Sequence, residues 1–196
     1  MISEFRITYS WRKRAEPCDF STEYYLDAPP LQMGLGYFAR VYEGVFTLHL
    51  DDLSLEFDFD PDLTILFFFI PGVLEKLLAR DEEPQDIYFC QHGTEVRLLL
   101  QAAGEAVALR LKKGNSQFSH IPDDAPISVS LVAFVSEWVG FARAVLEAVR
   151  TLQPGFEGDQ LNQEYKRRLL SFESTLQRQE AYKREEWALV SGEVTM

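Results

Sequence analysis

One glycine pattern in the sequence suggests a phosphate cradle, in the stretch DAPPLQMGLGYFARV at residues 27–41. A dinucleotide-binding turn requires a strand, then G-x-G-x-x-G, then a helix whose amide end holds the phosphate. Here Gly34 and Gly36 follow two prolines, position 39 is Ala, and no Lys-Ser or Lys-Thr follows. The residues after the glycines continue in a strand-like pattern. The stretch is therefore predicted to be a crossing loop whose glycines serve backbone geometry.

The residues that most often bind metals or act as nucleophiles are few and scattered. His49, His92 and His120 each stand alone in a predicted strand or turn, without a second ligand at helical spacing. Cys90 lies in a predicted strand and is expected to be a small core residue. No G-x-S-x-G motif is present. We therefore predict no catalytic residue, no metal site and no cofactor.

Carboxylates are the abundant chemical group, and they are concentrated in one part of the chain. Residues 43–95 hold 13 acidic and two basic residues, a local balance of −11 in a chain of net charge −12. A surface of this kind repels nucleic acid and membranes and attracts basic proteins. The densest stretch, DDLSLEFDFDPD, supplies six candidate partner-binding residues: Asp51, Asp52, Glu56, Asp58, Asp60 and Asp62. The alternative is a solvated face that keeps the chain soluble and discourages edge pairing.

The strands that would carry these carboxylates are predicted from alternating hydrophobicity. Residues 42–50 and 53–59 form a hairpin around a turn at Asp51 and Asp52, with the second strand apolar on one face and acidic on the other. Further strands are predicted at 2–9, 21–27, 87–91, 94–101, 105–113 and 127–129. Residues 61–80 predict a kinked or two-part helix, because Pro71 would interrupt a straight one. Residues 64–70 taken alone fit a strand as well as a helix.

Two more helices follow in the second half of the chain. Residues 131–152 carry apolar side chains at alternating steps of three and four, which predicts a helix buried against the sheet. After Pro154 and Gly155, a final amphipathic helix is predicted from an apolar stripe over 161–176, and its basic residues are almost fully offset by Glu. We expect an α+β fold with one antiparallel sheet of about six strands packed against two or three helices. Residues 1–155 form the domain, and residues 156–196 a helix packing on it or extending from it.

Composition favours a folded protein outside the membrane. Hydrophobic residues make up 46% of the chain and aromatic residues 13%, which is typical of a folded globule. The longest wholly apolar run, residues 65–70, is far shorter than a membrane span, and residues 1–17 lack the apolar core of a secretory signal. The two cysteines, Cys18 and Cys90, build no disulfide framework and fit a reducing compartment. We therefore expect a cytoplasmic protein with no membrane partner.

The order of these segments resembles that of small bacterial immunity proteins of polymorphic or contact-dependent toxin systems. The resemblance spans most of residues 2–152 and rests on PPLQMGLGYF, the acidic hairpin, a helix, a meander with HGTEVRLLL and the long helix FVSEWVGFARAVLEAV. It implies a non-enzymatic inhibitor that covers the active site of a toxin, often one that binds RNA or DNA and is therefore basic. The alternative is a structural or assembly subunit that self-associates as a homo-oligomer through residues 161–176. A small-molecule-binding protein or a hydrolase is a further alternative.

Overall fold

The computed structural model describes residues 2–16, 30–59, 62–91, 94–113, 126–152 and 160–191. Within these residues, the strands form two antiparallel sheets, and helices precede, separate and follow the runs of consecutive strands. The first sheet has the order β1-β2-β3, with bounds Phe5–Lys13, Tyr42–Leu50 and Leu53–Asp58. The second has the order β4-β5-β6-β7, with bounds Gln85–Gln91, Thr94–Ala103, Ala106–Lys113 and Pro126–Ser130.

The α+β fold with antiparallel strands is confirmed, whereas the single sheet of about six strands is wrong. The described residues also form four helices rather than two or three. The described residues contain seven strands, and the chain leaves the first sheet after β3 to form a helix before it starts the second. The predicted hairpin, the meander and the short strand near 127–129 are all present. The predicted strand at 21–27 lies outside the described residues.

The helix α1 (Pro30–Val41) occupies the stretch for which the sequence predicts a loop, so that prediction is wrong. Prolines and glycines weigh against a helix, but Pro30 stands at the first helical position, where its fixed φ and missing N–H are tolerated. Leu31, Leu35 and Phe38 recur on one face and are buried. The free energy gained by burying this face outweighs the low helix propensity of the two glycines. Both glycines lie within the helix and are shielded from solvent.

The segment after β3 forms one helix, α2 (Asp62–Leu78), with Pro71 inside it. Residues 64–70 are therefore helical, and the two-part alternative does not hold. Pro71 removes one backbone hydrogen bond, but buried side chains before and after it, such as Ile70 and Leu74, hold the helix on the core.

The two C-terminal helices are α3 (Leu131–Leu152) and α4 (Gln160–Ser191), both as predicted. Ser130 caps the start of α3, because its Oγ accepts a hydrogen bond from the Ala133 backbone N–H at 3.4 Å. The predicted stripe of α4 is buried against α1, α2 and α3, with Tyr165, Leu169 and Phe172 among its members. Burial raises the pKa of the Tyr165 hydroxyl, which keeps this side chain neutral.

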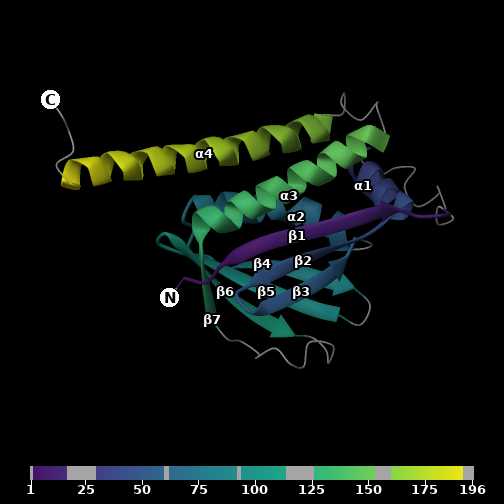
Figure 1. Cartoon of the computed structure of the whole chain (residues 1–196), viewed down its shortest axis with the longest axis horizontal. Helices are drawn as coiled ribbons and strands as arrows, with labels where there is room; N and C mark the ends of the chain where they lie inside the picture. Colours follow the sequence, from purple (N-terminus) through teal and green to yellow (C-terminus); the bar gives the residue numbers. More distant parts are fainter. Residues whose placement is uncertain are drawn as a thin grey trace.

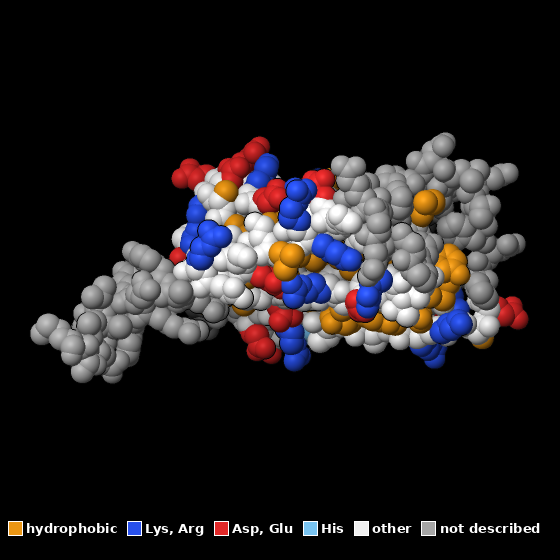
Figure 2. All heavy atoms as spheres, turned by 90° about the horizontal axis from the view of Figure 1, so that it is seen from above, with side chains coloured by type: hydrophobic (Ala, Val, Ile, Leu, Met, Phe, Trp, Pro, Cys, Tyr) orange, Lys and Arg blue, Asp and Glu red, His pale blue; other side chains and the backbone are white. Residues whose placement is uncertain are grey.

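The strands lie on one side of the molecule, with α3 above them and α4 as an outer layer (Figure 1). Seen from the helix side, Lys and Arg side chains are spread over the surface with acidic ones among them (Figure 2). One continuous core joins the layers: the Phe46 ring lies 6.2 Å from Phe89 of the second sheet and 5.2 Å from Phe141 of α3. In the described part of the chain, no helix is long and apolar enough to span a bilayer.

Candidate functional site

The outer face of β3 presents the acidic residues as the alternating sequence predicted. Leu55 and Phe57 point into the core and are fully buried, whereas Glu56 and Asp58 are exposed. β3 is the last strand of its sheet, hydrogen-bonded to β2 alone. Two carboxylates two residues apart on one strand face stand about 7 Å from each other. Because the buried side chains of Leu55 and Phe57 hold the strand on the core, the two carboxylates keep a defined spacing.

The six candidate residues do not act as one cluster. The Oδ1 of Asp51 accepts a hydrogen bond from the Glu4 backbone N–H at 2.7 Å, and Asp51 has a positive φ of 51°. Asp51 therefore ties the β2–β3 turn to the start of β1. Asp52 is exposed at the tip of the turn. Asp60 lies outside the described residues, and so does the side chain of Asp62, whose backbone begins α2. We define the acidic strip as Asp52, Glu56 and Asp58.

Most other carboxylates of the acidic segment are paired with bases, several of which come from distant parts of the chain. The recorded pairs are Glu43 with Arg12 and Arg14, Glu75 with Arg168, Glu83 with Lys76, and Asp86 with Arg97. In the strongest of these, Arg168 Nε and Nη2 donate to Glu75 at 2.7 and 2.8 Å, and this hydrogen bonding raises the pKa of Arg168. By contrast, neither Asp52 nor Glu56 forms an ion pair within the described residues. The local balance of −11 therefore overstates the acidity of the surface as a whole, because several of these carboxylates are paired with a base, whereas Asp52 and Glu56 are not paired with one among the described residues.

A polar row crosses the same sheet face beside the strip. Thr8 Oγ1 lies 2.8 Å from His49 Nε2, and His49 Nδ1 lies 3.0 Å from Ser54 Oγ. Both imidazole nitrogens thus face hydroxyl groups, and the described residues place no carboxylate in hydrogen-bonding contact with the ring. An imidazole that serves as a general base for Ser needs a group that orients it and stabilises its charge. The row therefore links three strands rather than forming a catalytic triad.

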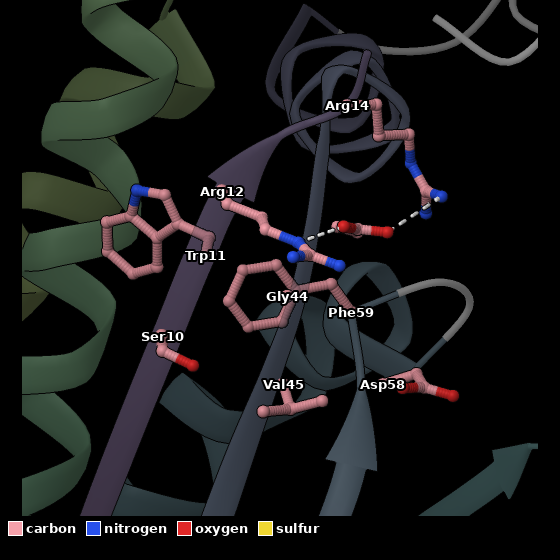
Figure 3. A pocket seen from close by; sticks show the side chains of 9 residues that line it. Ser10, Trp11, Arg12, Arg14, Gly44, Val45, Asp58 and Phe59 are labelled. Carbon is pink, nitrogen blue, oxygen red and sulfur yellow. Dashed lines mark hydrogen bonds and ion pairs between the residues drawn. The ribbon is translucent and has the colours of Figure 1, made fainter. Parts of the chain in front are cut away.

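A hollow of about 670 Å³ opens at the end of the first sheet, next to the strip (Figure 3). Asp58 stands on one side of it, and Arg12 and Arg14 stand on the other, where both reach Glu43. The Phe59 ring lines the hollow beside Arg12, and Trp11 lies on the side away from Asp58, where its ring centre is 5.9 Å from that of Phe59. The hollow thus carries charged groups of both signs around an aromatic and aliphatic surface.

Gly44 shapes this hollow because the Phe59 ring lies against its backbone. A Cβ at position 44 would stand 2.5 Å from Cε2 of Phe59 and 2.9 Å from the Ser10 carbonyl oxygen, closer than side-chain atoms approach. The Phe59 backbone N–H donates to the Gly44 carbonyl at 3.1 Å, which extends the β2–β3 ladder past β3. Any larger residue at position 44 would displace the ring and with it the wall of the hollow.

Metal and phosphate chemistry finds no support in the described part of the structure. No group of three His, Cys, Asp or Glu side chains there could hold a metal ion. His92, His120 and Cys18 lie outside the described residues, as does the side chain of Cys90. Gly34 and Gly36 lie inside α1 rather than before the amide end of a helix, so they cannot form a dinucleotide-binding turn.

The sequence did not reveal the hollow, since its walls come from residues far apart in the chain. Arg12 and Glu43 are register partners of β1 and β2, and a strand register cannot be read from hydrophobic alternation alone. No protein-family model, curated protein or solved structure matches this chain.

Proposed function

We propose that this chain is a non-enzymatic protein-binding module that acts in the cytoplasm and uses its acidic strip to bind a basic protein, as an immunity protein binds a toxin. The observation that carries the proposal is the presentation of Glu56 and Asp58. Both are exposed on one face of an edge strand whose opposite face is fully buried. Rigid carboxylates at fixed spacing attract a basic surface over long range and set its orientation without an ordering cost for the strand.

The hollow beside the acidic strip offers a binding site for one side chain of the partner. A Lys or Arg of the partner that pairs with Asp58 would lay its aliphatic stem against Val45, which is the register partner of Asp58 in β2 and lines the same hollow. Lys and Arg commonly bury their stems in this way while the charged group stays near water. Charge would thus steer the encounter, and the hollow would add specificity to the complex.

The packing of α4 favours this function over self-association through residues 161–176. That stripe was the basis of the alternative, but Tyr165, Leu169, Phe172 and Leu176 are buried in the core of their own chain. Pairing with a second copy through the same residues would first expose this apolar surface to water, which is unfavourable.

The proposal is tested by co-expressing the chain with each basic protein encoded beside it and measuring their affinity. We expect one salt-sensitive complex. The double variant Glu56→Lys/Asp58→Lys should weaken it by about 30-fold or more, because each reversal replaces an attraction with a repulsion.

The matched control is Glu82→Lys/Glu164→Lys, which changes net charge by the same amount at exposed residues away from the strip. It should retain most of the affinity. If both double variants weaken binding equally, only overall charge matters and the strip is not the contact. If neither weakens it, the partner binds elsewhere.

A further inference from the structure

A groove of about 360 Å³ runs between α3 and α4 on the side of the molecule away from the strands. α3 contributes Arg143, Leu146, Glu147 and Arg150, which recur on one face of that helix. α4 contributes Lys166, Leu169 and Leu170 at the same helical spacing. Arg143 donates a hydrogen bond to Glu173, while Arg150 lies across from residues near the start of α4, so the two helices run antiparallel.

The walls of the groove carry more cations than carboxylates, although the chain as a whole is strongly acidic. Three cations and one carboxylate line the groove, against a net charge of −12 for the chain. Arg143 is held by Glu173, and Arg150 by Glu147 of its own helix. Lys166 has no counter-ion in the described part of the structure. In Figure 2, which shows this side, Lys and Arg side chains lie among acidic and hydrophobic ones.

The floor of the groove is apolar. Leu146 and Leu169 are almost fully buried and form its base, whereas Leu170 is 55% exposed on one wall. An exposed leucine therefore lies beside a lysine that has no counter-ion among the described residues. Such a surface suits a ligand that carries an apolar part and a negative charge within a few ångströms of each other.

We propose that this groove binds an anionic amphiphile, an alkyl carboxylate of about ten carbons, with its head group on Lys166 and its chain on the leucines. A volume of about 360 Å³ lies in the range of small-molecule sites, and such sites combine apolar walls with a few polar groups. An inorganic anion would leave the leucines uncovered, whereas an alkyl carboxylate meets both the ammonium group and the apolar floor. The site is independent of the acidic strip.

The test measures binding of decanoate to the full chain by calorimetry, below the concentration at which decanoate forms micelles. We expect saturable binding to one site. Replacing the carboxylate by a hydroxyl, as in decanol, or Lys166 by Gln, should each weaken binding about tenfold through loss of a charge-assisted hydrogen bond. Leu170→Asn should also weaken it, because it removes apolar cover.

The matched control is Arg167→Gln, which removes the same charge from an exposed neighbouring residue that does not line the groove. It should bind decanoate as the unmodified chain does, and circular dichroism should show that every variant keeps its helices. The proposal is overturned if Arg167→Gln weakens binding as much as Lys166→Gln, if decanol binds as tightly as decanoate, or if decanoate binds only as micelles.

Discussion

The two sheets share one core, but the edge strand β3 of the first sheet and the outer face of the second present opposite charges to solvent. On the first sheet, β3 exposes Glu56 and Asp58. On the second sheet, Tyr88, Arg97 and Lys112 stand side by side in register across β4, β5 and β6. β4 belongs to the acidic segment of the sequence, yet its Asp86 lies 3.5 Å from Arg97. The comparison teaches that strand register, rather than the composition of a segment, decides the charge of a surface.

The largest effect is expected where the two sheets meet. The Phe89 ring stacks on Phe57 at 4.0 Å, so Phe89→Ala should lower the free energy of unfolding by about 3–5 kcal/mol. Urea denaturation should still give one transition by fluorescence and circular dichroism, since both sheets are part of one core. Tyr88→Ala, one residue away on the outer face, is the control and should cost far less. Two separate transitions would show that the sheets unfold independently.

A smaller effect is expected at the hollow. Gly44→Ala should destabilise the chain by roughly 1–3 kcal/mol, because the added Cβ would collide with the Phe59 ring. Gly140→Ala in α3 is the matched control, since a Cβ at that position would meet nothing within 4 Å and Ala favours a helix by about 1 kcal/mol. Thermal unfolding of both variants should therefore shift in opposite directions. Equal shifts would contradict the close packing of Phe59 on Gly44.

The smallest effects on stability are expected for charged residues on the outer faces of the two sheets. Arg97 lies 4.9 Å from the centre of the Tyr88 ring and also pairs with Asp86, so Arg97→Gln should cost about 0.5–1 kcal/mol. Glu56 has no such partner in the described structure, and Glu56→Gln should change stability by less than about 0.5 kcal/mol. Chemical denaturation measures both. A larger cost for Glu56→Gln would mean that this carboxylate serves the fold rather than a partner.

Most of the helices and strands could be predicted from local patterns. The remaining features of the fold depend on packing between residues that are distant in the sequence. The alternation in β3 and the three-and-four spacing in α3 are properties of short segments, and both predictions are confirmed. The loop predicted around Gly34 is instead a helix, which is stabilised by burial of Leu35 and Phe38 that no local propensity reveals. The division into two sheets depends on which strands pair, and that is decided by the whole chain.

Only the part of the candidate site that depends on local alternation could be predicted from the sequence. Glu56 and Asp58 are exposed as their alternation predicts, whereas Asp51 bonds to a residue 47 positions away and serves the turn. The hollow beside Asp58 depends on Gly44 accepting the ring of Phe59, and on Arg12 meeting Glu43 across two strands. None of these contacts can be inferred from neighbours in sequence.

The central claim, that the acidic strip contacts a basic partner, is tested most directly by amide hydrogen exchange in the complex. Phe59 donates to Gly44 across the ladder, so by alternation the amides of Ser54 and Glu56 point away from β2. Binding should slow exchange at residues 52–58 and leave the outer face of β5 and β6 unchanged. Slowed exchange on β5 and β6, with residues 52–58 unaffected, would contradict the claim.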